Sequence, residues 1–314
     1  MRVHRFAIAA AVATFILTIF GGVVSVTESG LACPDWPLCE GKFIPQMVDG
    51  KQYEHSHRLV ASFVGAMTFG LMALLIKYRR KQPHLVKLGI FAAALVTVQA
   101  LLGAATVILR LPWAITSAHL AVATAFFVLM TSLAFLTHPS RQSLPAVHKP
   151  LARMIVPVGL LLFMQVVGGG VMRHLRAGLA CGFDLPLCNG TLWPIDGYAG
   201  VQVHMVHRLL GVLSALAVLG LMVWIWRRPE AGRALKIVAA VAGVGVLAQV
   251  TLGVLTVLLS REIFTINTHS SLGIGLMSVV TWMYWLAAPA AAAAPTRAAH
   301  VPDARPSAGN PVEA

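Results

Sequence analysis

The chain has 314 residues, of which 58% are hydrophobic and only 11% are charged. Soluble domains are about 25% charged, so most of this chain is expected to be solvated by lipid, and collagen-like, disordered and nucleic-acid-binding proteins are excluded. The formal net charge of +13 does not indicate a nucleic acid partner. The Lys and Arg residues lie in short loops between apolar runs, a placement typical of membrane proteins.

Eight apolar segments are long enough to cross a lipid bilayer as helices. A hydrocarbon core about 30 Å thick needs about 20 residues, at about 1.5 Å per residue. The segments are residues 6–26, 57–77, 87–109, 113–136, 151–172, 204–226, 235–259 and 265–287. A cleaved signal peptide is the alternative interpretation of the first segment, because Arg2 and Arg5 precede it. Its full length, and its recurrence as the fifth segment, favour a permanent helix.

Lys and Arg residues predict the orientation of the helices, because cationic loops stay in the cytoplasm. The loops that follow the second, fourth and sixth segments are rich in Lys and Arg, whereas residues 27–56 contain more acidic than basic residues. We therefore expect both termini in the cytoplasm and residues 27–56 outside it. Residues 289–314, which are rich in Ala and Pro with scattered charge, are expected to form a disordered cytoplasmic tail.

The second half of the chain repeats the first at an offset close to 150 residues. The matching residues are His57-Arg58 and His207-Arg208 (207 − 57 = 150), His119 and His269, Gln99 and Gln249, Gly103 and Gly253, Thr106 and Thr256, and the Gly-Leu-Ala-Cys runs ending at Cys33 and Cys181. Each half contains four spans, so both halves have the same orientation. The predicted fold is an all-α polytopic membrane protein. Its eight transmembrane helices form two homologous four-helix bundles, residues 1–148 and 149–288, related by a pseudo-two-fold axis along the membrane normal.

Four of the 12 histidines lie at one predicted depth, just inside the outer ends of the even-numbered spans: His57, His119, His207 and His269. Helices two apart in sequence run in the same direction, so each half offers two imidazoles at matching height, the geometry of the two axial ligands of a haem iron. The alternative is that each histidine bonds a backbone carbonyl or a lipid headgroup. The repeated spacing favours haem. Five others are expected to be solvated in cytoplasmic segments: His4, His84, His138, His148 and His300.

Haem is favoured over a bare metal ion because the spans contain no cysteine or carboxylate cluster that would complete a tetrahedral zinc site. Small residues near the ligands are expected to leave room for a macrocycle: Gly65, Ala118, Ala121, Gly211, Gly273 and Gly275. Arg58 and Arg208 directly follow their histidines at the water boundary. Each guanidinium would pair with a haem propionate or, as the alternative, with a lipid phosphate.

The symmetry is broken three residues before the paired histidines. Glu54 precedes His57 in the first half, whereas His204 precedes His207 in the second. Residues three apart share a helix face, so Glu54 is expected to project towards the same cofactor as His57. A carboxylate there would take a proton or stabilise developing positive charge, which predicts one reactive half and one auxiliary half. The alternative is that Glu54 is one more acidic residue of an external loop.

The four cysteines fall as two close pairs, Cys33 with Cys39 and Cys181 with Cys188. Both pairs lie in predicted outer loops, where disulfides are expected. Closing such short loops stabilises the fold by about 2 kcal/mol in the chain-entropy model. The structural role is our default interpretation, and a redox-active dithiol is the alternative. Covalent haem attachment is not indicated, because the sequence has no Cys-x-x-Cys-His motif.

These residues together resemble one family, the haem A synthases of bacterial and mitochondrial inner membranes, over the chain up to about residue 288. The resemblance rests on eight spans in two halves, Glu54-x-x-His57-Arg58, His119, His207, His269 and the two external cysteine pairs, although the two cysteine spacings differ by one residue. It implies an oxidoreductase of the cell inner (plasma) membrane. Such an enzyme oxidises the C8 methyl group of haem O to a formyl group, giving haem A for terminal cytochrome oxidases.

The resemblance also implies a role for each half. His57 and His119 would receive the substrate haem, with Glu54 as the essential acid. His207 and His269 would hold a haem b (iron) cofactor. Because histidines take both axial positions of the substrate iron, oxidation is expected at the porphyrin edge, where Glu54 handles protons or stabilises a cationic carbon. A haem O synthase, an electron acceptor and a second copy of the chain are candidate partners.

Two other function classes use the same sequence features. A quinol-linked dihaem b electron-transfer protein would use the four histidines and would not need Glu54. A transporter is less favoured, because the sequence shows no charged residue and no pair of Pro-broken helices at mid-membrane depth to bind a solute.

Overall fold

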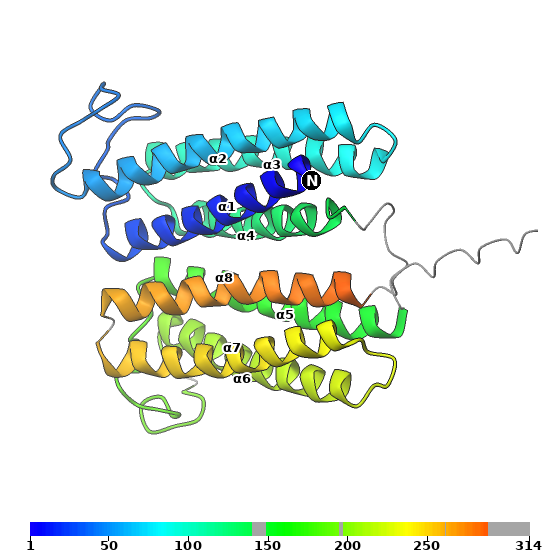
Figure 1. Cartoon of the computed structure of the whole chain (residues 1–314). Helices are drawn as coiled ribbons and strands as arrows, with labels where there is room; N and C mark the ends of the chain where they lie inside the picture. Colours follow the sequence, from blue (N-terminus) through cyan, green and yellow to red (C-terminus); the bar gives the residue numbers. More distant parts are fainter. Residues whose placement is uncertain (140–148, 195–196, 261, 288–314) are drawn as a thin grey trace, which may run out of the picture.

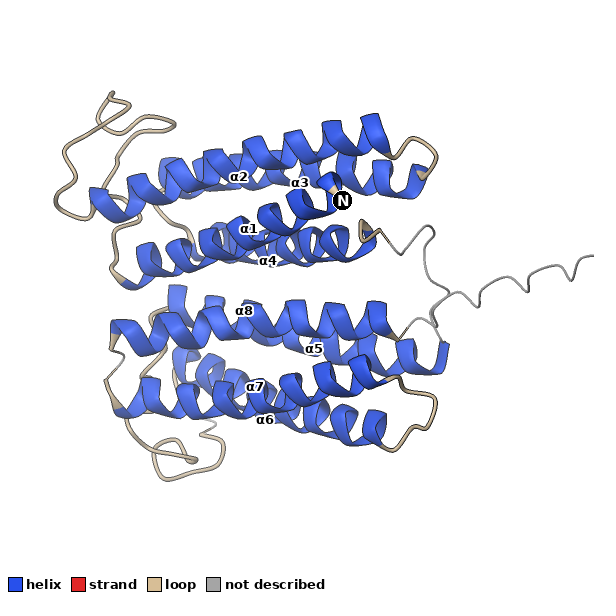
Figure 2. Ribbon diagram, viewed as in Figure 1, coloured by secondary structure: helices blue, strands red, loops and turns tan. Residues whose placement is uncertain are grey.

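The computed structural model describes residues 1–139, 149–194, 197–260 and 262–287. Within these ranges the chain forms helices joined by loops (Figure 2). The helices are α1 (Arg2–Val26), α2 (Lys51–Tyr78), α3 (Pro83–Ile108), α4 (Trp113–Leu136), α5 (Lys149–His174), α6 (Ala199–Trp226), α7 (Arg233–Leu258) and α8 (Ile263–Leu286). All 8 are long and apolar enough to cross a membrane. The prediction of an all-α, multi-pass membrane protein is therefore confirmed.

The helices pack as two groups of four that lie side by side (Figure 1). In the first bundle α1 contacts α2 and α4, and α3 contacts α2 and α4; in the second, α5 contacts α6 and α8, and α7 contacts α6 and α8. The neighbours in one bundle thus match those in the other, as the repeat predicts. Contacts of α1 with α8, and of α4 with α5 and α8, join the bundles. The predicted boundary at residue 148 and the predicted tail lie outside the described residues.

Each bundle has its own apolar core. Leu71, Leu75 and Met130 are fully buried in the first bundle, and Ile155 and Ile225 in the second. Many other apolar side chains are exposed on the helix surfaces, as expected where helix association depends on packing rather than on exclusion of water. Each bundle therefore has a core of its own, and the contacts of α4 with α5 and α8, and of α1 with α8, join the two.

Helix α1 is one wall of the first bundle. Val3, Ala7 and Ala10 are buried against its neighbours, since small side chains allow helices to approach closely. A cleaved signal peptide would leave this core open on one side. The packing supports the prediction of a permanent first span.

The helices that carry the paired motifs begin earlier than the apolar runs. Helix α2 begins at Lys51 rather than at residue 57, and α6 begins at Ala199 rather than at residue 204. Polar residues end the apolar run but continue the helix, because the extra turns pack against the preceding loops. Glu54 therefore lies on α2 with His57, as the sequence analysis predicts.

Two loops at one end of the molecule carry the cysteine pairs, and we call this end the disulfide end (Figure 1). The sulfurs are bonded in both pairs, Cys33 with Cys39 and Cys181 with Cys188. The Asp35 carboxylate accepts hydrogen bonds from the backbone N–H groups of Glu40 (2.6 Å) and Gly41 (2.8 Å). The hydrogen bond from Gly41, and to a smaller extent that from Glu40, holds the pKa of the Asp35 carboxyl below its ordinary value.

Candidate functional site

A cavity of about 1420 Å³ opens near the disulfide end and is lined by residues of both bundles. Pockets for a single small molecule are typically about 300–1,000 Å³, so this cavity has room for more than one ligand. The four predicted histidine ligands all line it: His57, His119, His207 and His269. Each lies about two turns from the start of its helix, on α2, α4, α6 and α8. The structure thus brings together the histidines that the repeat singled out.

Each of the four imidazoles lies against a glycine of the preceding helix. A β-carbon at that glycine would be 3.0–3.2 Å from the ring carbon Cε1, a contact tighter than ordinary packing. The pairs are Gly21 with His57, Gly103 with His119, Gly169 with His207, and Gly253 with His269. Because each of these glycines has no side chain, the imidazole ring of the next helix can pack against the glycine backbone. The same arrangement occurs four times, once for every predicted ligand.

Glutamine amides and backbone carbonyls surround the imidazoles. Gln99 donates from Nε2 to the backbone oxygen of His119 (3.0 Å), and Gln165 Nε2 lies 3.4 Å from Nε2 of His207. The Nδ1 atom of His269 lies 3.1 Å from the backbone oxygen of Gln249. A carbonyl oxygen only accepts, so Nδ1 carries the proton and Nε2 is left as a metal ligand. This arrangement is typical of metal-bound histidines.

Glu54 and Arg58 form one hydrogen-bonded unit at the mouth of the first bundle. Glu54 is only 3% exposed, and its two carboxylate oxygens accept from the backbone N–H of Cys33 (2.7 Å) and from Arg58 Nη2 (2.5 Å). Arg58 also donates to the backbone oxygens of Cys33, Asp35 and Leu38. This pair therefore ties the disulfide loop to α2 beside His57. Glu54 also lines the cavity, with His57.

The equivalent position in the second bundle is built differently. Arg208 donates from Nη1 to the backbone oxygen of Leu187 (2.7 Å), but its Nη2 atom is buried with no hydrogen-bond partner among the described residues. His204, which replaces the acid, is also buried and lines the cavity. A buried guanidinium nitrogen without a partner is costly. The unmet donor therefore suits an anionic group inside the cavity.

Three residues at the site have no role in the sequence analysis. His55 is buried beside the first disulfide, and one of its ring nitrogens and the two bonded sulfurs all lie within 4.8 Å of one another. Its counterpart at the 150-residue offset is Met205, whose Sδ atom lies 3.7 Å from Cys181 Sγ.

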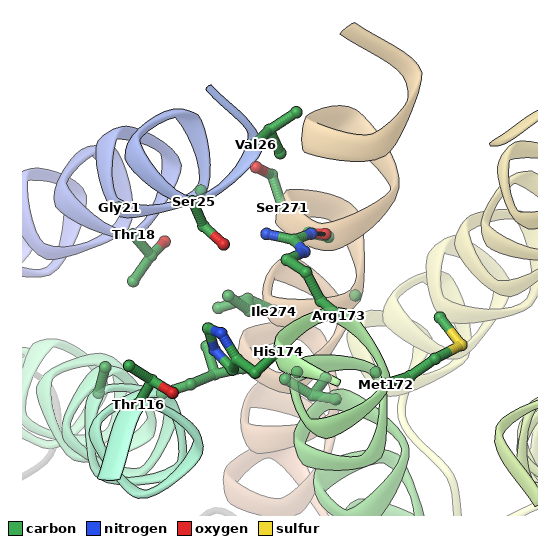
Figure 3. A pocket seen from close by; sticks show the side chains of 18 of the residues that line it. Thr18, Gly21, Ser25, Val26, Thr116, Met172, Arg173, His174, Ser271 and Ile274 are labelled. Atoms are coloured by element: carbon green, nitrogen blue, oxygen red, sulfur yellow. Dashed lines mark hydrogen bonds between the residues drawn. The ribbon is translucent and has the colours of Figure 1, made fainter. Parts of the chain in front are cut away.

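Arg173 and His174 line the cavity between the bundles, where His174 points into the space bordered by Thr18 and Thr116 (Figure 3). These residues break the repeat, and that break is the signal that would have found them.

Three of the small residues predicted to make room for a macrocycle line the cavity: Gly65, Gly211 and Gly273. A β-carbon at Gly65 would meet open space, but Gly211 and Gly273 lie against the amides of Gln165 and Gln249, and Gly275 lies against Phe15. Their lack of a side chain permits close packing, the usual role of glycine in membrane helices. The glycines that matter for the imidazoles lie instead on the odd-numbered helices.

The residues present fit two haem groups. Two pairs of imidazoles line one roomy cavity, glycines accommodate their rings, and the buried Nη2 atom of Arg208 has no hydrogen-bond partner among the described residues. Imidazole pairs facing across a helical bundle are ligands suited to haem iron. Fold and site together define a polytopic helical membrane protein with one imidazole pair in each of two bundles.

The comparisons with known proteins give the family. The COX15-CtaA family, described as cytochrome oxidase assembly protein, matches residues 4–55 and 51–281, and the chain belongs to this family. It is 32% identical over 280 residues to a "Heme A synthase" of Shouchella clausii, covering 87% of this chain and 92% of the relative. "Heme A synthase" proteins of Halalkalibacterium halodurans (32% over 264 residues; 81% and 87% covered) and Alkalihalophilus pseudofirmus (30% over 287; 90% and 96%) are also similar.

Proposed function

We propose that the protein catalyses haem A synthesis, the oxidation of the C8 methyl group of haem O to a formyl group. The similarity to three relatives named "Heme A synthase", over most of each chain, supports this activity. The observation that carries it is the asymmetry of the two imidazole pairs. Within the described part of the chain, only the first pair lies beside a buried carboxylate, that of Glu54, which a reactive site needs and an electron carrier does not.

The proposal gives each half one haem. His57 and His119 bind the iron of haem O, the substrate, and His207 and His269 bind haem b as a cofactor. When bound, haem b supplies one-electron transfer. The observed glycine contacts support both assignments equally, because they hold all four rings at the cavity wall. The assignment of substrate to the first half rests on Glu54.

The residues of the first bundle position the substrate rather than activate dioxygen. His57 and His119 would hold the substrate iron from both sides, so oxidation of the methyl group would take place at the porphyrin edge. Going from the methyl group through an alcohol to the formyl group adds one oxygen atom at the oxidation level of water and removes four protons and four electrons, and an external electron acceptor would take these electrons by way of haem b. Glu54, in a buried setting with little water, accepts a proton or stabilises positive charge at that carbon. Arg58 and the Cys33 N–H keep its carboxylate in place.

The orientation in the membrane is part of the proposal. The loops at the end opposite to the disulfides are the cationic ones, which are retained in the cytoplasm. The disulfide end then faces the oxidising side, where disulfides persist. Both termini are cytoplasmic, and haem O reaches the site within the plasma membrane.

Pigment analysis tests this function. The protein is expressed in a host that makes haem O but lacks haem A synthesis, and haems are extracted from membranes and separated by chromatography. We expect haem A with the wild-type chain and none with His57→Ala. Protohaem alone in the purified protein, with no haem A in the membranes, would contradict the proposal and favour the dihaem electron carrier.

A further inference from the structure

The two halves of the cavity differ in the charges at their disulfide-end rims. We propose that Arg173 and Arg208 form a carboxylate-binding rim that retains the haem of the second bundle, whereas the first bundle lacks this rim and releases its haem. The inference rests on the proposed function, because it explains why one haem stays as cofactor and the other leaves as product. It assigns to Arg173 the role of a positioning residue for haem propionates.

Arg173 lines the cavity between the bundles, close to the second imidazole pair. It follows Gly169 by four residues on α5 and therefore lies on the same helix face, one turn nearer the disulfide end. Gly169 is the residue against which the His207 ring packs. The Arg173 Nη2 atom donates to the hydroxyl of Ser270, next in sequence to His269, and Figure 3 shows the side chain extending alongside α8 towards Ser271. One guanidinium thus reaches from the helix wall behind one ligand to the residue beside the other.

Arg208 adds a second cation at this rim. It follows His207 directly and lines the same cavity. Its Nη1 atom is used by the loop, through Leu187, but its buried Nη2 atom has no partner among the described residues. A planar guanidinium binds a carboxylate through two parallel hydrogen bonds, and such charge-assisted bonds strengthen where water is excluded. Haem carries two propionate carboxylates, which match two arginines.

The first bundle has neither feature at the matching positions. Ser25 takes the place of Arg173 (173 − 25 = 148, the offset of Cys33 and Cys181), and Leu120 takes the place of Ser270 (270 − 120 = 150). The matching arginine, Arg58, already donates from Nη1 and Nη2 to three backbone oxygens and to Glu54. Its charge is neutralised inside the protein.

Arg110 is the cation of the first half that needs a separate account. It lines the cavity and its counterpart is Ser260, the reverse of the Arg173 pattern. Arg110 is exposed, however, in the turn between α3 and α4. An exposed charge interacts weakly because water and salt screen it. We therefore expect Arg110 to contribute little to haem retention.

The test measures haem loss from the second bundle alone. His57→Ala and His119→Ala are introduced together, so that only the second imidazole pair binds haem. The purified protein in detergent is mixed with excess apomyoglobin as haem acceptor, and the transfer rate is followed optically. Arg173→Ser, which copies the residue of α1, should speed the loss about tenfold or more, the factor expected for one charge-assisted hydrogen bond. Arg173→Lys should lose haem at a rate between those of the parent and Arg173→Ser. Arg110→Ser should leave the rate unchanged.

The reverse variant tests the first bundle. With His207→Ala and His269→Ala in place, Ser25→Arg should slow haem loss from the first imidazole pair. Loss rates for Arg173→Ser and Arg173→Lys within twofold of the parent, with a normal helical circular dichroism spectrum, would overturn the proposal. The readout does not depend on the reaction. If no haem A is made by the wild-type chain but Arg173→Ser still loses haem faster, the proposed function fails and the retention rim stands.

Discussion

The ring of His207 occupies the space that a side chain at Gly169 would fill. A β-carbon at Gly169 would be 3.0 Å from Cε1 of His207. The two residues lie on α5 and α6, so this contact fixes how far the ligand ring can move towards the wall of the bundle. The same relationship links Gly21 with His57, on α1 and α2.

Replacing Gly169 by alanine should therefore disturb the haem iron of the second bundle. Alanine favours helix formation by about 1 kcal/mol over glycine, so the helix itself should not be weakened. The added methyl group should push the His207 ring by a few tenths of an ångström and weaken its bond to iron. We expect part of the haem to change from a six-coordinate low-spin to a five-coordinate high-spin optical spectrum.

Gly220→Ala is the matched control for this change. Gly220 lies on α6, and a β-carbon there would have nothing within 4 Å. This variant should gain the helix propensity of alanine without a spectral change. If Gly169→Ala and Gly220→Ala gave the same spectrum as the wild type, the close contact would have no influence on ligation.

That the four histidines lie around one cavity could be predicted, because the repeat marks each pair twice. The glycines behind them were not assigned to that role, although Gly103 and Gly253 were visible as a repeated pair. Periodicity shows which residues share a helix face, but not which residue of the next helix they touch. Arg173 and His174 were missed for a different reason. The residues at the matching positions of the first half are of other types, and a search for repeated residues passes over positions where the halves differ.

Substitution of one histidine in each pair should separate the two haem sites. His207→Ala should remove or loosen the haem b cofactor and leave the first site able to bind porphyrin, since the imidazole pairs lie on different helices. His57→Ala should have the opposite effect. Haem content per protein and the optical spectrum after purification measure both. Equal loss of both haems from either variant would show that the bundles do not bind haem independently.

The first disulfide loop should loosen in acid. Asp35 accepts two backbone hydrogen bonds that lower its pKa from the ordinary 3.8. A group with a lowered folded-state pKa stabilises the structure above its ordinary value, and this stabilisation is lost as the pH falls through the lowered pKa. Reduction of the Cys33–Cys39 disulfide by a phosphine should therefore accelerate below about pH 3.8 relative to reduction of a small-molecule disulfide measured at the same pH.

Asp35→Asn should reproduce this loosening at neutral pH, because an amide oxygen accepts more weakly than a carboxylate. The reduction rate of Cys33–Cys39 should rise severalfold, and that of Cys181–Cys188 should not change. Asp184→Asn is the matched control, since Asp184 accepts from Gly190 in the second loop. If neither acid nor Asp35→Asn changed the reduction rate of the Cys33–Cys39 disulfide, the Asp35 carboxylate would not hold this loop.

Glu54 has two tasks in the structure, and two substitutions separate them. Its carboxylate holds the Cys33 N–H and Arg58, and it is the acid at the edge of the first cavity. Glu54→Gln keeps the shape and one acceptor oxygen, so the loop and haem binding should persist, but the amide neither accepts a proton nor carries a negative charge. Extracted pigment should then stall at haem O or its alcohol. Glu54→Ala removes both tasks and leaves Arg58 buried without its counter-ion, which should also lower the haem content. Haem A formed at the wild-type rate by Glu54→Gln would show that only the structural task matters.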